Sequence, residues 1–81
     1  MKYTNSEVEE ALKVAGAENI EAYTLINNHG FTFTKKGAKY DLRHILNVYG
    51  AKCDFWEIIA ENKHKFESTN LPGLLEELKN I

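Results

Sequence analysis

The segment 31–35 (Phe-Thr-Phe-Thr-Lys) alternates strictly, with Phe31 and Phe33 on one face and Thr32 and Thr34 on the other. A period of two is the pattern of a β-strand with one buried face. Turn-forming residues flank this segment on both sides, the sequence Asn-Asn-His-Gly over 27–30 and the pair Lys36-Gly37. The turns predict neighbouring strands over 20–26 and 38–40. The expected product is a three-stranded antiparallel meander with one apolar face.

Helices are needed to cover that face. The first is expected to be capped by Ser6, in a capping box with Glu9, and to end at Gly16. Apolar residues at helical spacing predict three more helices, over 42–50, 54–66 and 72–81. The first two are expected to be capped by Asp41 and Asp54, and the third to begin at Pro72. The predicted order is α-β-β-β-α-α-α, in a single α+β domain that spans residues 1–81.

The length of 81 residues suits one small domain, and an apolar fraction of 43% is normal for a globular protein. Cys53 is the one cysteine, so an internal disulfide is excluded and nothing favours an oxidising compartment. The sequence shows no apolar run of the length that a signal peptide or a membrane span requires. These features predict a cytoplasmic protein without a membrane association.

Positive charge is concentrated in the middle of the chain. The segment 31–52 holds five basic residues and a single acidic one, whereas the whole chain carries a formal charge of −2. Segregated charge concerns partners and association rates rather than fold. The lysines of the predicted hairpin, with nearby aromatic and basic residues, form the candidate partner-binding set: Lys35, Lys36, Lys39, Tyr40, Arg43 and Trp56. The alternative interpretation is that lysines at strand edges keep a small sheet soluble.

Two kinds of partner fit a basic hairpin. One is a protein with an acidic groove, and the other is the phosphate backbone of a nucleic acid, bound without regard to base sequence. Lysine lacks the bidentate fork that reads guanine, and the chain has only one arginine, Arg43. A helix-turn-helix formed by the segments 42–50 and 54–66 is disfavoured, because Glu57 and Glu61 would face the phosphates.

Candidate residues for catalysis or metal binding are sparse. Glu57, Glu61 and His64 fall on one face of the predicted helix, and Glu-x-x-His spacing occurs in di-iron proteins, but a second such motif is missing. Cys53 precedes a predicted helix without a histidine placed near it by the sequence. We therefore expect neither an enzyme nor a metal or cofactor site.

The Leu-rich segment 71–78 could close the core of the domain or pair with another copy, so a homodimer is an open alternative. Taken together, the sequence predicts a non-enzymatic protein-binding module of inhibitor or adaptor type. Its expected docking element is the basic hairpin with the adjacent aromatic residues. The alternative is a nucleic-acid-binding protein that uses the same hairpin.

Overall fold

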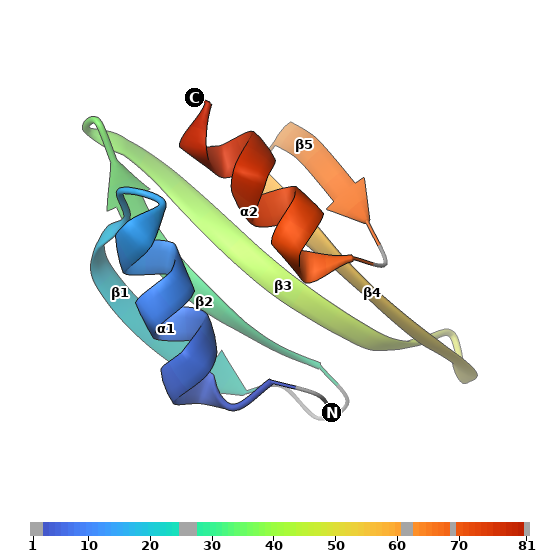
Figure 1. The fold of residues 1–81 in the computed structure, drawn as a ribbon. Helices are drawn as coiled ribbons and strands as arrows, with labels where there is room; N and C mark the ends of the chain where they lie inside the picture. The colour runs from blue at the N-terminus through green and yellow to red at the C-terminus, as the bar shows by residue number, and fades with distance from the viewer. Residues whose placement is uncertain (1–2, 25–27, 61–62, 69, 81) are drawn as a thin grey trace.

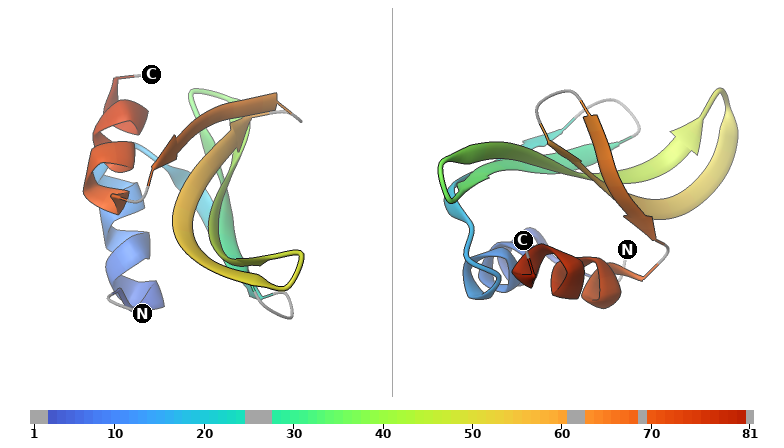
Figure 2. Two further views of the ribbon diagram at one scale, coloured as in Figure 1. Left: turned by 90° about the vertical axis from the view of Figure 1, so that its right-hand side faces the viewer. Right: turned by 90° about the horizontal axis from the view of Figure 1, so that it is seen from above.

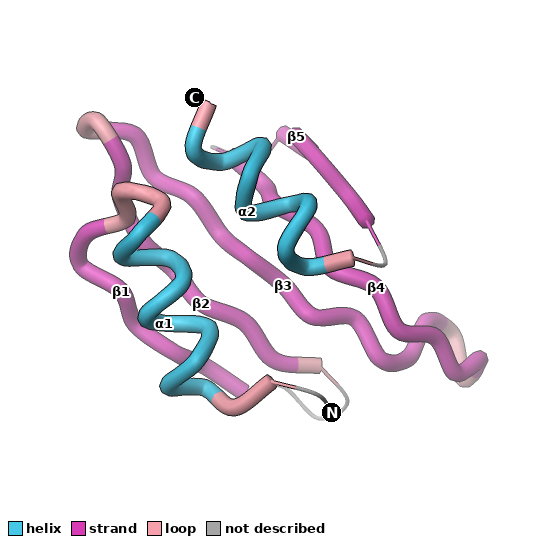
Figure 3. Tube along the Cα trace, viewed as in Figure 1, coloured by secondary structure: helices cyan, strands magenta, loops and turns pink. Residues whose placement is uncertain are grey.

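The computed structural model describes residues 3–24, 28–60, 63–68 and 70–80, with the backbone alone over 63–68. Seven elements follow one another in the order α-β-β-β-β-β-α (Figure 1; Figure 3). Their bounds are α1 Asn5–Val14, β1 Glu18–Thr24, β2 His29–Lys35, β3 Ala38–Val48, β4 Ala51–Ala60, β5 Lys63–Ser68 and α2 Leu71–Lys79.

The strands form one antiparallel sheet in the order β1-β2-β3-β4-β5. Strands β1 to β4 make a continuous four-stranded sheet, and β5 pairs with β4 at its edge. The prediction of a three-stranded meander followed by three helices is therefore wrong. The segments 42–48 and 54–60, which were expected to be helical, belong to β3 and β4.

The reason for this error lies in the apolar residues after the Lys36-Gly37 turn. Leu42, Ile45 and Leu46 suit a helix by spacing alone, but Leu42 also continues the alternation that begins at Tyr40. In the sheet, Leu42 lies opposite Phe31 on β2 and is fully buried. Pairing with two neighbouring strands thus overrides the helical spacing.

Both ends of the chain form the helices that the sequence predicts, with small shifts. Helix α1 is capped by Thr4 and not by Ser6, because the Thr4 hydroxyl accepts the Glu7 N–H at 3.2 Å. The Glu7 carboxylate in turn accepts the Thr4 N–H at 2.9 Å, which completes a capping box two residues earlier than expected. Helix α2 is capped by Asn70.

Both helices lie on one face of the sheet and form a second layer (Figure 2). The core is the space between the layers, where the inward side chains of β2, β3 and β4 meet the apolar faces of α1 and α2. Its members include Val8, Leu12, Phe31, Phe33, Leu42, Trp56, Ile58, Leu71, Leu74, Leu75 and Leu78. Neither of these helices is long and apolar enough to cross a membrane.

Candidate functional site

The far end of the β3–β4 hairpin, residues 46–53, is named the finger here. It extends beyond the helical layer and curves away from it (Figure 1; Figure 2). Tyr49 at its tip is fully exposed, and Val48 beside it is also exposed. A large aromatic side chain that contacts nothing in its own fold contributes no burial to folding. The tip is therefore an apolar surface directed outward.

The backbone at the tip is unusual for the residue that occupies it. Val48 pairs with Ala51, so the turn consists of Tyr49 and Gly50 alone, both with positive φ (52° and 83°). Asparagine or glycine is the favoured residue at the first of these positions. A bulky residue in the left-handed region costs about 1–3 kcal/mol, and Lys36 adopts the same conformation in the Lys36-Gly37 turn, with φ of 52°. A bond from the Gly50 N–H to Asn47 Oδ1 (3.0 Å) closes the turn.

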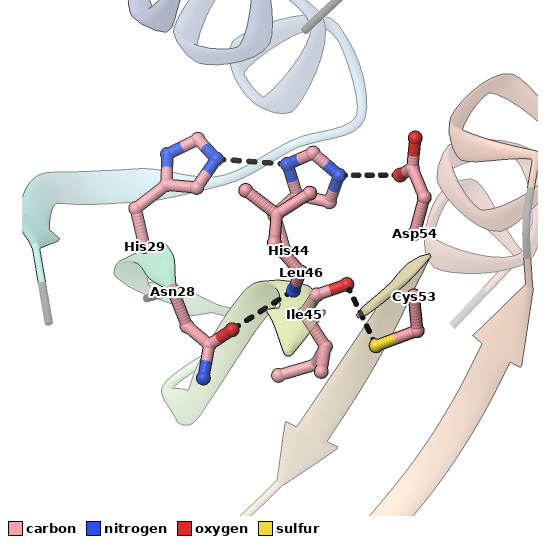
Figure 4. A network of polar contacts seen from close by, with 7 residues as sticks. All are labelled: Asn28, His29, His44, Ile45, Leu46, Cys53 and Asp54. Carbon is pink, nitrogen blue, oxygen red and sulfur yellow. Dashed lines mark hydrogen bonds and ion pairs between the residues drawn. The ribbon is translucent and has the colours of Figure 1, made fainter. Parts of the chain in front are cut away.

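A group of polar contacts holds the base of the finger, and we call it the root network. Figure 4 shows its seven members: Asn28, His29, His44, Ile45, Leu46, Cys53 and Asp54. The network lies at a β-bulge, because β4 advances three residues between the pairs Ile45–Phe55 and Asn47–Lys52 while β3 advances two. Bulges bend and twist a strand pair, so this one accounts for the change in direction of the finger.

Two of these contacts tie the backbone of β3. The Leu46 N–H donates to the Asn28 side-chain oxygen at 2.8 Å, and the Cys53 thiol contacts the Ile45 carbonyl at 3.6 Å. Asn28 lies just before β2, and Cys53 lies on β4. The base of the finger is thus connected to both neighbouring strands.

The other contacts form a chain of three titratable side chains. His29 Nε2 lies 2.8 Å from His44 Nδ1, and His44 Nε2 lies 2.6 Å from Asp54 Oδ1 (Figure 4). A carboxylate only accepts, so His44 carries its proton on Nε2 and accepts at Nδ1 from His29. One set of tautomers satisfies the whole chain.

The environment differs sharply along this chain. His44 is 2% exposed and stacks in parallel on Trp56, with ring centroids 4.0 Å apart. The Asp54 side chain is 71% exposed. Burial, and secondarily the neighbouring His44, lower the pKa of His29. Two charged imidazoles with centroids 5.0 Å apart would repel each other by about 3 kcal/mol at an effective dielectric constant of about 20.

The residues that the sequence placed in a binding surface lie in three different environments. Lys35 and Trp56 are buried, at 5% and 2% exposure. Tyr40 faces the helices and stacks on Phe33 at 5.5 Å. Lys36 occupies the exposed turn, Lys39 is exposed on the opposite side of β3 from Tyr40, and Arg43 shares that side.

These residues do not form one patch. Arg43 Nε donates to Asp41 Oδ2 at 2.9 Å, so much of its charge is compensated within the sheet. Lys35 and Trp56 have almost no surface to offer a partner in this structure. A partner-binding role for Lys36 and Lys39 stays a prediction.

The helix on which the candidate metal ligands were expected to share a face does not form over residues 54–60, which belong to β4. Glu57 lies on β4 opposite Arg43, whereas Glu61 lies outside the described residues and no side chain is described for His64. Within the described part of the chain, three or more His, Cys, Asp or Glu side chains nowhere gather as metal ligands would.

Sequence reasoning placed Tyr49 on the inner side of a predicted helix and missed the histidine chain, although the sequence carried a signal for the turn at Tyr49 and for the pairing of the histidines. In a two-residue hairpin, residues at equal distances from the turn pair with each other. His29 and His44 lie at equal distances from the Lys36-Gly37 turn, and the structure pairs them. The Tyr49-Gly50 pair between β-branched and small residues was a second turn signal, but the segment was assigned to a helix.

Comparisons with protein-family models, curated proteins and solved structures found no match to this chain.

Proposed function

We propose that this chain is a small, non-enzymatic protein-binding module of inhibitor or adaptor type that docks through the tip of the finger. The observation that carries the proposal is the fully exposed Tyr49, held at positive φ at the end of a long hairpin. Tyrosine is among the residues that dominate binding energy at protein interfaces. The network at its base supplies the rigidity that lowers the entropic cost of binding.

The composition of the finger specifies the kind of partner. Its exposed side chains include Val48, Tyr49 and Lys52, and no carboxylate lies within residues 46–53. Such a tip fits an apolar pocket with acidic residues at its rim. This agrees with the acidic groove that the charge distribution suggested, but the docking element is the β3–β4 hairpin and not the β2–β3 hairpin.

A protein partner is favoured over a nucleic acid because the basic residues of the β2–β3 hairpin diverge. Lys35 points into the core and Lys39 points away from it. Backbone binding to nucleic acid gains from several cations directed to one side, since each phosphate contact adds to the affinity. We place the function in the cytoplasm, on the grounds of the single cysteine.

The test is affinity capture from the native host with the wild-type chain and two variants. Tyr49→Ser removes the aromatic anchor from an exposed tip, and the double variant Lys36→Glu/Lys39→Glu reverses the charge of the basic hairpin. We expect the Tyr49→Ser variant to lose the captured protein, identified by mass spectrometry, and the double variant to retain it. Capture that depends on Lys36 and Lys39 but not on Tyr49 would contradict the proposal. Nuclease-sensitive capture would favour the nucleic-acid alternative.

A further inference from the structure

We propose that the partner of the finger is a second copy of the same chain, and that Tyr49 of one copy enters the groove between α1 and α2 of the other. The inference rests on the proposed function, because it names the partner of the same docking element. The composition of the finger requires a binding site with an apolar pocket large enough for an aromatic ring and with negative charge at its rim.

The groove between the two helices has the required size and apolar lining. Its volume is about 400 Å³, which lies within the range of about 300–1,000 Å³ found for ligand pockets. Apolar side chains from both helices supply most of its walls: Val8, Ala11, Val14, Leu71, Pro72 and Leu75. Val14 is 71% exposed, so apolar surface continues from the groove to the outside.

The rim of the groove carries the charge that complements the finger. Glu7 and Glu76 contribute carboxylates, and Lys79 contributes an ammonium that pairs with Glu76 at 3.2 Å. The formal charge at the rim is therefore negative, whereas Lys52 is the charged residue within the finger. Opposite charges around an apolar contact guide association and fix its orientation.

The finger does not contact the groove of its own molecule. Figure 2 shows that the finger curves away from the helical layer, so the two surfaces of one copy face different ways. Contact between them requires a second molecule. Since finger and groove are different surfaces, two copies either exchange fingers across a two-fold axis or add head to tail.

Sedimentation equilibrium of the purified chain, from about 10 µM to about 1 mM, tests the inference. We expect the wild type to associate with rising concentration and Tyr49→Ser to weaken association by about tenfold or more, because truncation of a central aromatic anchor has an effect of that order. Lys39→Glu is the matched control. It alters an exposed charge outside both surfaces, and we expect association to be unchanged.

A charge exchange tests the groove itself. Lys52→Glu places a carboxylate against the negative rim and should weaken association, and adding Glu76→Lys to it should restore much of the loss. Both positions are exposed, so neither change threatens the fold. Failure of the second change to restore association would overturn the assignment of the groove.

A wild type that remains monomeric throughout the concentration range would overturn the inference. It would leave the proposed function standing if Tyr49 still governs capture of a different protein. Association that is unaffected by Tyr49→Ser would likewise overturn it. If Tyr49→Ser changes neither self-association nor capture, the proposed function fails as well.

Discussion

Sequence analysis assigned Lys35 to the surface, but its side chain is buried and contributes to the packing of the interior. It is only 5% exposed, lies beside Gly16 just after α1, and donates from Nζ to the Leu78 carbonyl near the end of α2. A cation is favourable at the C-terminal ends of helices, where carbonyl groups lack partners. Burial, followed by the charge of Lys36, lowers the pKa of Lys35. The hydrogen bond to the helix end offsets part of this desolvation.

Replacing Lys35 should therefore reduce stability more than replacing an exposed lysine. Lys35→Met keeps much of the aliphatic packing but removes the ammonium, and we expect a loss of about 1–3 kcal/mol in the free energy of unfolding. Lys39→Met, at an exposed position, should change it by less than about 0.5 kcal/mol. Urea denaturation measures both. Equal stability of the two variants would show that the buried ammonium has no structural role.

Tyr23 on β1 is a second residue whose environment determines its chemistry. Its hydroxyl donates to Asp41 Oδ1 at 2.8 Å, and its ring covers Gly30, where a Cβ atom would come within 2.6 Å of the hydroxyl oxygen. Burial, together with the hydrogen bond to Asp41 and the charge of that residue, raises the pKa of Tyr23 to about 12. The nearby Arg43 acts in the opposite direction but does not cancel the effect.

The raised pKa has a defined consequence at high pH. The folded state holds the Tyr23 proton more tightly than the unfolded state, so this contribution to stability is complete below pH 10 and is lost as the pH rises toward 12. Ultraviolet titration of tyrosinate should show a step near pH 12 that Tyr23→Phe abolishes. If the step removed by Tyr23→Phe lies near pH 10 instead, the hydroxyl is not held by Asp41.

At the scale of elements, the β3–β4 hairpin is divided by its bulge into a part packed on the core and the finger. His44 lies at this division and bonds to His29 on β2 and to Asp54 on β4. The finger therefore emerges from a fixed base, and the order of its backbone depends on side chains outside residues 46–53. Local stability of this kind is measurable by hydrogen exchange.

Removing one end of the histidine chain should loosen the finger alone. Asp54→Ala deletes the acceptor for His44 Nε2, and we expect the protected finger amides to exchange about tenfold faster, which corresponds to about 1.4 kcal/mol of local stability. Amides of α1 provide the internal control and should be unaffected. A uniform change over both regions would mean that the variant lowers global stability and that the root network has no separate role.

His29 makes stability dependent on pH in the acidic range. Because its pKa in the folded state lies below the ordinary value of 6.5, the unfolded state binds its proton first as the pH falls. The contribution of neutral His29 to the free energy of unfolding is complete above pH 6.5. It is lost as the pH drops through the pKa that His29 has in the folded state. We expect the urea concentration at the midpoint of unfolding to decrease as the pH is lowered from about 7.5 to about 5. The decrease should be smaller in His29→Gln. Identical pH profiles would contradict this account.

At the scale of the whole molecule, the sequence predicted the elements whose signals are local. Strand β2, the Lys36-Gly37 turn and the inward leucines Leu74, Leu75 and Leu78 of α2 are confirmed. The cap of α1 was wrong by two residues because two capping boxes overlap there. Local signals suffice where a short segment admits one periodicity.

The errors arose where the apolar residues of a segment fit both the helical and the strand periodicity. In such a segment, pairing with a neighbouring strand decides which structure forms. The apolar residues of 42–50 fit a helix until the strand that begins at Ala38 is extended beside β2. That one misassignment placed residues 46–50 of the finger in a helix with Tyr49 on its inner side, and it concealed the pairing of His29 with His44. Trp56 lies in a second misassigned segment, 54–66. Lys35, in contrast, lies in a correctly predicted strand and shares the buried face of Phe31 and Phe33 by the same alternation.

We propose for the whole molecule that the finger tip, and not the basic hairpin, is the docking element. Site-specific photo-crosslinking in the native host tests this most directly, with p-benzoylphenylalanine in place of Tyr49 in one variant and of Lys39 in another. The account predicts a discrete crosslinked protein, a second copy of the chain included, from position 49 and little from position 39. Crosslinks that form from position 39 and are missing at position 49 would contradict it.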